Sequence, residues 1–260
     1  SGIQETQYVF IDSNRLNERW LASTKSSFHI GETGFGTGLN FLVATQQFLA
    51  FRKQHPSSPL TKLYFLSTEK YPLTKSDLNK ALKLWPELSG LSEALVELYP
   101  LALPGMHRIH LFDGSVVLDL WLGDATEGFN QTHSHPEGRI DAWFLDGFSP
   151  AKNPEMWSSK IASCLAEASH SETTFSTYTV AGFVKKNFEE AKFSLLKLKG
   201  FGKKRSMLTG KSISKEKKAI KKKKTIGIVG AGIAGCSLAK ILADRGHNVI
   251  IFDKEDGPSK

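Results

Sequence analysis

The sequence predicts an α/β fold built on a doubly wound, mostly parallel β-sheet with an antiparallel hairpin at one edge. Three observations lead to this prediction. Apolar strand-like runs such as residues 28–32 alternate with helical stretches such as residues 39–54. The dipeptide Asp113-Gly114, typical of a hairpin turn, separates the apolar runs 107–112 and 116–121. Strands that alternate with helices are typical of a parallel sheet that helices cover on both faces.

The other elements of this α/β body follow in order from about residue 7 onward. The patterns predict strands at 63–68, 141–146 and 173–179, a closing antiparallel pair at 195–201 and 206–209, and helices at 76–85, 91–99, 154–168 and 180–192. Ligands of doubly wound sheets bind beyond the carboxyl ends of the strands, where the strand order reverses. We therefore look for chemistry in the turns that follow these strand ends.

Composition excludes several classes of protein. Hydrophobic residues make up 40% of the 260 residues, enough for a sizeable core and too many for wholesale disorder. No apolar run approaches the roughly 20 residues needed to span a bilayer, and no signal-peptide pattern opens the sequence. Cys164 and Cys236 give no disulfide framework and no zinc-ligand spacing. We expect a cytoplasmic, monomeric protein without a metal or a membrane partner.

The net charge of +8 is concentrated in one short segment. Residues 203–224 hold 11 basic side chains and one acid, Glu216, so the rest of the chain is close to neutral. Such a run is typical of a solvated linker, and a basic arm that steers RNA is the alternative interpretation. The charge alone therefore does not establish nucleic-acid binding.

The first glycine-rich turn follows a strand and opens a helix, and it is the first candidate cofactor site. Its candidate residues are Gly31, Glu32, Thr33, Gly34, Phe35, Gly36, Gly38 and Asn40. Glycine allows a backbone to approach a ligand closely, and the helix N-terminus offers unpaired N–H groups to a carboxylate. The acid at 32 suits a cationic adenosyl cofactor, S-adenosylmethionine, better than a pyrophosphate. A merely tight turn and a dinucleotide site remain the alternatives.

Two further acids follow the next strand ends. Glu69, beside Lys70, is placed to accept hydrogen bonds from both ribose hydroxyls of a nucleoside cofactor. Asp124, beside Ala125, is placed to accept from the adenine amino group. A surface glutamate and an ordinary loop aspartate are the structural alternatives, so both assignments depend on the glycine turn.

The strand end at residue 146 is the candidate catalytic centre. An apolar strand delivers Asp146 to the sheet edge, and Gly147 and Pro150 then force a defined turn. A carboxylate here can hold an acceptor amine and take its proton, because the attacking nitrogen must be neutral. Phe148 can stack on a planar base, and Lys152 can contact a phosphate, as candidate substrate residues. An Asp that only caps the turn, and a solvated loop lysine, are the alternatives.

The C-terminal segment carries a second glycine motif. Residues 225–252 are predicted to form strand, turn, helix and strand, with Gly230, Gly232 and Gly235 in the G-x-G-x-x-G pattern. Asp253 follows Gly230 by 23 positions, near the spacing of a ribose-binding acid. One such unit is too small to stand as a dinucleotide domain, so we expect a piece of a longer protein.

Residues 28–42, 69–73 and 141–157 together resemble the methyltransferase half of the MnmC family, bifunctional proteins that make 5-methylaminomethyl-2-thiouridine in tRNA. The likeness covers roughly residues 7–210, and residues 178–182 and 200–201 also fit it. It implies a class I S-adenosylmethionine-dependent methyltransferase with a Rossmann-like fold. We expect this domain at 1–210, a Lys-rich linker at 211–224 and the truncated start of an FAD-dependent oxidoreductase at 225–260.

The resemblance also implies an order of reactions. The oxidase half converts the carboxymethylaminomethyl group of the wobble uridine to aminomethyl, and the methyltransferase half then methylates that primary amine with S-adenosylmethionine. The partner is tRNA, and only methyl transfer is expected of this chain. An FAD- or NAD-dependent oxidoreductase, or a methyltransferase for another amine, remain alternatives.

Overall fold

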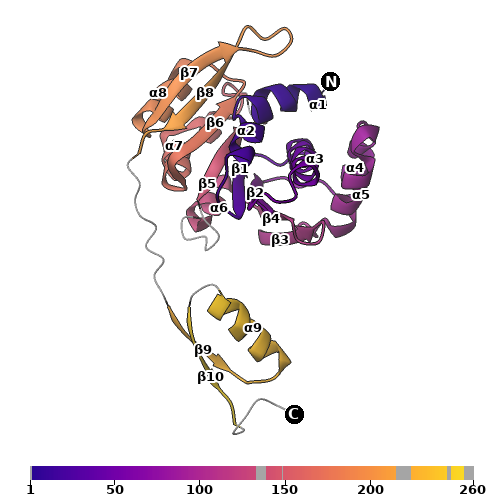
Figure 1. Ribbon diagram of the computed structural model, residues 1–260. Coiled ribbons are helices and arrows are strands. Elements are labelled where there is room, and N and C mark those ends of the chain that lie inside the picture. Colours follow the sequence, from indigo (N-terminus) through magenta and orange to yellow (C-terminus); the bar gives the residue numbers. More distant parts are fainter. Residues whose placement is uncertain (1, 133–138, 148, 215–223, 245–246, 255–260) are drawn as a thin grey trace. The chain divides into compact units, whose positions relative to one another are not determined.

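A computed structural model describes residues 2–132, 139–147, 149–214, 224–244 and 247–254. The chain divides into two compact units, residues 1–216 and residues 217–260, which are considered separately below (Figure 1). Among the described residues, no helix combines the length and the apolar character that crossing a membrane requires. No group of three or more His, Cys, Asp or Glu side chains in the described part of the chain is arranged to hold a metal ion.

The first unit is built on an eight-stranded mixed sheet in the order β3-β4-β2-β1-β5-β6-β8-β7. The strands are β1 (Ser27–Glu32), β2 (Lys62–Glu69), β3 (Gly105–Leu111), β4 (Val116–Leu122), β5 (Ile140–Leu145), β6 (Ser169–Thr177), β7 (Phe193–Lys199) and β8 (Ser206–Ser212). The central pairings β4–β2, β2–β1, β1–β5 and β5–β6 are parallel. The pairings β3–β4, β6–β8 and β7–β8 are antiparallel. The strand order reverses between β1 and β5, which makes their carboxyl ends the switch point of the sheet.

Helices cover both faces of this sheet (Figure 1). The helical elements are α1 (Gly2–Thr6), a π-helical segment η1 (Gln7–Asp12), α2 (Leu16–Leu21), α3 (Leu39–Gln54), α4 (Lys75–Leu82), the 3-10 turn η2 (Pro86–Leu88), α5 (Ser89–Leu98), α6 (Ala125–Thr132), the 3-10 turn η3 (Pro154–Trp157), α7 (Ser159–Glu167) and α8 (Gly182–Glu190). One core cluster lies under α1 to α5 and contains Trp20, Phe41 and Phe65. The other lies under α6 to α8 and contains Trp143 and Phe175. Burial of these large apolar side chains drives the sandwich of helix, sheet and helix.

The predicted fold is confirmed, and the hairpin turn is built as its sequence indicates. Phe112, Asp113 and Gly114 all have positive φ, and β3 pairs with β4 in antiparallel register. One predicted helix is wrong in detail, because residues 154–168 do not form one continuous helix. Pro154 begins a 3-10 turn, and α7 starts only after Ser158, whose hydroxyl accepts from the backbone N–H of Ile161 as an N-cap.

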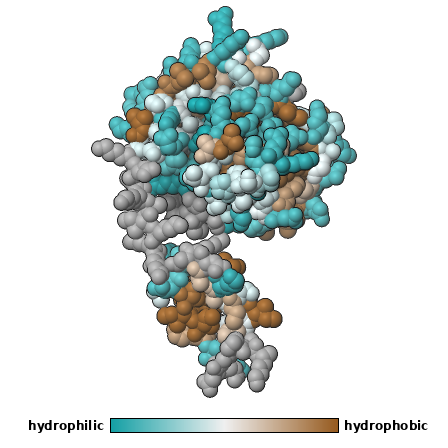
Figure 2. All heavy atoms as spheres, in the orientation of Figure 1, coloured by the Kyte–Doolittle hydropathy of each residue, from teal (hydrophilic) through white to brown (hydrophobic). Residues whose placement is uncertain are grey.

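The second unit is a single strand–helix–strand unit. Its elements are β9 (Thr225–Val229), α9 (Ile233–Asp244) and β10 (Asn248–Phe252), and the two strands are parallel. Figure 2 shows brown, hydrophobic surface on this unit. Its exposed large apolar side chains are Val229, Ile233, Leu238, Ile241, Ile250, Ile251 and Phe252. The described part of this unit does not enclose a core of its own.

Candidate active site

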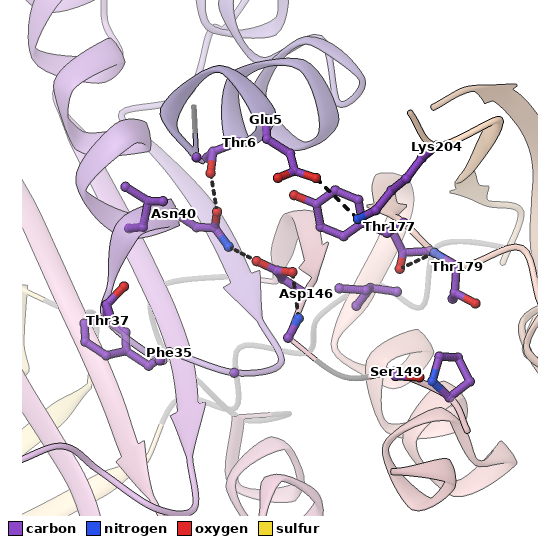
Figure 3. Close-up of a pocket in the computed structure, with 18 of the residues that line it drawn as sticks. Glu5, Thr6, Phe35, Thr37, Asn40, Asp146, Ser149, Thr177, Thr179 and Lys204 are labelled. Atoms are coloured by element: carbon purple, nitrogen blue, oxygen red, sulfur yellow. Dashed lines mark hydrogen bonds and ion pairs between the residues drawn. The ribbon is translucent and has the colours of Figure 1, made fainter. Parts of the chain in front are cut away.

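A cavity of about 640 Å³ opens at the carboxyl ends of β5 and β6, beside the first glycine turn (Figure 3). This volume suits a small-molecule cofactor or substrate. Its wall is formed by Gly2, Glu5, Thr6, Gly34, Phe35, Gly36, Thr37, Leu39, Asn40, Leu145, Asp146, Gly147, Ser149, Pro150, Trp157, Thr177, Tyr178, Thr179 and Lys204. The cavity therefore lies at the switch point of the sheet, where the sequence places the chemistry.

The glycine turn brings bare backbone to this cavity. Gly36 has a φ of 54° and a Cβ there would meet open space, whereas Gly38 has a φ of 73° and lies against the ring of Phe35. Gly38 is the N-cap of α3 and has no side chain that could cap this helix. The first turn of α3 therefore presents backbone N–H groups and the positive end of the helix dipole to the cavity wall.

Glu32 lies beneath the turn rather than in the cavity. Its side chain is completely buried, and it accepts hydrogen bonds from Ser67 Oγ at 2.6 Å and Asn40 Nδ2 at 2.9 Å. Burial raises the pKa of Glu32 well above its usual range, although both hydrogen bonds oppose this shift. Glu32 is therefore buried and does not line the cavity, and its role toward a cofactor stays a prediction.

Asn40 links this buried acid to the candidate catalytic acid. Its amide nitrogen donates to Glu32 and, at 2.7 Å, to Asp146 Oδ2, while its amide oxygen accepts from the Thr6 hydroxyl at 2.8 Å (Figure 3). The two acids fix which end of the amide is the nitrogen, because an ionised carboxylate can only accept, and the Thr6 hydroxyl then donates to Oδ1. All polar atoms of Asn40 are thus engaged within the protein, and its role is to position the two carboxyl groups.

Asp146 lies at the end of β5 with its carboxyl group facing the cavity. The backbone N–H of Gly147 donates to Oδ1 at 2.7 Å, and Gly147 has the positive φ of 94° that this tight turn needs. Burial raises the pKa of Asp146, while the hydrogen bonds from Asn40 and Gly147 and the charge of Lys204 oppose the rise. The group therefore combines a fixed geometry with a proton affinity above that of an ordinary aspartate, as a general base requires.

Three side chains on the opposite wall were not predicted from the sequence. Lys204, in the β7–β8 turn, places Nζ 3.7 Å from the centroid of the Tyr178 ring and 3.3 Å from Glu5 Oε1. Glu5 comes from α1 and Tyr178 follows β6, so three distant segments meet here. No local motif marks these residues, since the chain brings them together only through the fold.

The remaining predicted residues of the first turn divide by position. Gly34, Phe35 and Gly36 line the cavity. Gly31 is buried on the Trp143 side of the sheet, where a Cβ would collide with the indole, so this glycine serves packing. Thr33 is also buried, and its hydroxyl donates to the backbone oxygen of Asp146 at 3.2 Å.

The predicted ribose and adenine residues lie next to the turn but not on the cavity wall. Glu69 Oε2 accepts from the Gly36 backbone N–H at 2.9 Å, and its Oε1 accepts from Tyr71 N–H. The Lys70 side chain is exposed, and its Nζ lies 5.9 Å from the centroid of the Tyr71 ring.

The turn after β4 adds the other two predicted residues. Asp124 is exposed and accepts from the Thr126 backbone N–H at 2.9 Å, as a helix cap does, and Ala125 is buried. The backbone oxygen of Glu69 accepts from Gly123 N–H at 2.9 Å, so both acids lie at the same sheet edge. Their roles toward ribose and adenine stay predictions.

The two predicted substrate residues follow the Asp146 turn. Phe148 lies outside the described residues. Lys152 is exposed and does not line the cavity, and its backbone N–H donates to the Ser149 backbone oxygen at 2.9 Å. Ser149 and Pro150, between them, do line the cavity.

The second glycine turn keeps the geometry of its motif. Gly230 has a φ of 102°, and a Cβ on Gly235 would collide with the Gly230 carbonyl oxygen. The Asp253 carboxylate accepts a hydrogen bond from the Ala231 backbone N–H within this turn. Gly232 lies at the start of α9, where its carbonyl oxygen accepts from Cys236 N–H.

Comparison with known proteins agrees with this architecture. A family model described as S-adenosyl-L-methionine-dependent methyltransferase matches residues 86–213, and one described as NAD(P)-binding Rossmann-like domain matches residues 228–259. A crystal structure described as MNMC2 from Aquifex aeolicus aligns with a TM-score of 0.63 at 22% identity, covering 82% of this chain and 61% of that chain. This likeness shows the fold alone.

The chain also resembles proteins of known name in its sequence. The chain is 45% identical over 270 residues to the tRNA 5-methylaminomethyl-2-thiouridine biosynthesis bifunctional protein MnmC of Vibrio campbellii, covering 100% of this chain and 40% of that protein. It is 45% identical over 266 residues to the MnmC protein of Aliivibrio fischeri, covering 98% of this chain and 39% of the relative. The chain thus spans about two fifths of the length of these relatives. It is similar along almost its whole length to these MnmC proteins, and its residues 86–213 match the S-adenosyl-L-methionine-dependent methyltransferase family model.

Proposed function

We propose that the first unit transfers a methyl group from S-adenosylmethionine to the primary amine of a 5-aminomethyl-2-thiouridine at the wobble position of tRNA, which gives 5-methylaminomethyl-2-thiouridine. The observation that carries this proposal is the position of Asp146. Its carboxylate is fixed by Asn40 and Gly147 and faces the cavity that the glycine turn also lines. The tRNA biosynthesis product in the name of the MnmC relatives supports the choice of substrate.

The residues of the cavity fit the cofactor. Gly34 and Gly36 leave room for close approach, and the uncapped start of α3 offers N–H groups to the methionine carboxylate. Glu69, held by Gly36 N–H, lies where a ribose-binding acid is expected. S-adenosylmethionine supplies, when bound, a methyl group on a sulfonium that a neutral amine can attack.

Asp146 supplies the proton transfer that this chemistry needs. An alkylamine is largely protonated at neutral pH and has no lone pair to offer until it loses one proton. The Asp146 carboxylate accepts that proton, which leaves the nitrogen neutral, and passes it to solvent after the product leaves. The raised pKa of Asp146 lies closer to the pKa of the ammonium group, which lowers the free-energy cost of the proton transfer.

Labelled methyl transfer from S-adenosylmethionine to tRNA tests the proposal. Wild-type protein should label tRNA that carries aminomethyluridine and leave tRNA without that group unlabelled. Asp146→Asn should lower kcat by about 10²- to 10⁴-fold, the range for loss of a general base, while S-adenosylhomocysteine binding by calorimetry is retained. Asp141→Asn, a matched change at the opposite end of β5, should keep kcat in the folded fraction. Normal turnover of Asp146→Asn would refute the assignment.

We infer further that the second unit begins an FAD-binding oxidoreductase domain of a longer cytoplasmic protein. The support is the glycine turn at Gly230 and Gly235, the match to a Rossmann-like family and the bifunctional relatives. The oxidase reaction then belongs to the longer protein, and FAD titration of that protein with flavin fluorescence as readout checks this. The domain division at 210 and 224 and the monomeric state remain proposals, which limited proteolysis and light scattering can test.

A further inference from the structure

The cavity already contains an alkylammonium group that belongs to the protein itself. Lys204 reaches in from the β7–β8 turn, with Nζ 3.7 Å from the centroid of the Tyr178 ring and 3.3 Å from Glu5 Oε1 (Figure 3). About half of its side chain is exposed, at 51%. The lysine is therefore held at the cavity wall by an aromatic face and a carboxylate, and it is not packed into the core.

An aromatic face beside a carboxylate is the chemistry that recognises a cationic amine. The rings of Tyr178 and Phe10 pack in a T-shaped pair, with 5.5 Å between centroids, and this contact restrains the orientation of the Tyr178 ring. Burial raises the pKa of Tyr178, so the phenol stays neutral and its ring remains available to a cation. The site thus exists before any substrate arrives.

The charge of the cavity also favours a cation. Among the described residues that line it, the charged side chains are Glu5, Asp146 and Lys204. With Lys204 in place the wall carries one more ionised acid than base when both carboxyl groups are charged. A phosphate at Lys204 would face both Glu5 and Asp146, whereas an amine would be attracted by both.

We propose that Tyr178 and Glu5 form the subsite that receives the ammonium group of the acceptor, and that Lys204 is its internal occupant, displaced when the substrate enters. This inference rests on the proposed function. The incoming amine exchanges contacts with Lys204, so its entry replaces one cation by another and leaves the net charge of the wall unchanged. It is then next to Asp146, which takes its proton. The subsite selects a protonated alkylamine over a hydroxyl or a neutral ring nitrogen, which gain nothing from the two acids.

Steady-state methylation of tRNA carrying aminomethyluridine tests the displacement. Lys204→Met keeps the length of the side chain and removes the competing cation, so KM for this tRNA should fall by about threefold, the scale of one exposed cation–π contact or ion pair. Lys203→Met is the matched control, because it removes the same charge from an exposed neighbour, and its KM should not fall. A KM for Lys204→Met that rises or stays unchanged overturns the proposal, since a phosphate contact would give a rise.

A second pair of variants tests the aromatic face. Tyr178→Phe keeps the ring and should leave KM within about twofold, whereas Tyr178→Leu should raise it about tenfold with S-adenosylhomocysteine binding retained. Equal KM values for Phe and Leu overturn the role of the ring. The proposed function and the ammonium subsite are refuted by different results. Wild-type protein that does not methylate this tRNA refutes the proposed function. An active wild type whose Lys204 and Tyr178 variants break the expected order refutes the subsite alone.

Discussion

Replacing Asn40 with alanine tests whether its amide controls the two acids that it contacts. The change removes three hydrogen bonds, to Glu32, Asp146 and Thr6, of 2.9, 2.7 and 2.8 Å. Glu32 is completely buried and, within the described residues, keeps only the Ser67 hydroxyl as a donor, so loss of the Asn40 hydrogen bond costs about 2 kcal/mol. The buried Thr6 hydroxyl adds about 1 kcal/mol, whereas Asp146 can turn to water in the cavity.

The expected loss of stability is therefore about 3 kcal/mol, or about 9 °C in Tm for a unit of this size, measured by thermal unfolding. The kinetic effect has a defined sign. The Asn40 hydrogen bond lowers the pKa of Asp146, so its removal raises that pKa further. Because the ionised carboxylate is the active form, the acid limb of the kcat profile should move to higher pH, and kcat at neutral pH should fall by up to about a hundredfold.

Asn14→Ala is the matched control for this experiment. Asn14 is also a buried asparagine with three hydrogen bonds, to Phe10 O, Ser176 Oγ and Thr174 Oγ1, but it does not line the cavity. Asn14→Ala should lose a similar amount of stability, whereas the acid limb of its kcat–pH profile should stay where it is in the wild type. If the limb of Asn40→Ala also stays in place while its stability falls, Asn40 is only a structural residue and the reasoning is wrong.

Three further predictions concern stability, each measured by denaturant unfolding. Gly31→Ala should destabilise by about 2 kcal/mol, because its Cβ would collide with the Trp143 ring, and an unchanged midpoint would contradict this packing. Although burial alone would raise it, the pKa of Asp141 is lowered by the His170 hydrogen bond and nearby cations. Ionised Asp141 therefore stabilises the folded protein at pH values above its unfolded pKa of about 3.9. The difference in free energy of unfolding between wild type and Asp141→Asn should shrink as the pH falls below about 4. The buried Tyr99 hydroxyl has no hydrogen-bond partner within the described residues, and burial raises the pKa of Tyr99 to about 12. Tyr99→Phe should therefore stabilise by about 1 kcal/mol, and a loss of stability would reveal a partner for this hydroxyl.

Local patterns were enough to predict most of the sheet. The helix at 39–54 begins and ends as its apolar spacing indicates, and the turn at Asp113 forms the predicted hairpin. Residues 2–21 were not predicted as helices, because they form short segments of five or six residues that carry no long period. Their burial against the main core, at Phe10 and Trp20, depends on partners far along the chain.

The site residues that belong to a local sequence motif could be predicted. Those that the fold brings together from distant parts of the sequence could not. Gly36 and Asp146 belong to local turns, and the structure places both on the cavity wall. By contrast, Lys204 and Glu5 are 199 residues apart, a contact that only the finished fold creates. Glu32 shows a different limit of prediction from sequence. The sequence marks it as an acid beside the glycines but does not say that its side chain turns inward.

The contact between Glu5 and Lys204 makes the first helix and the last hairpin of the sheet unit mutually dependent. A shortened version that lacks residues 1–6 would retain all eight strands, yet it would lose the Thr6 hydroxyl that orients Asn40 and one wall of the cavity. A version ending before Lys204 would lose β8, which pairs with β6 and β7. Any excised catalytic fragment must therefore keep both extremities of this unit, and fusion tags or labels are best attached away from them.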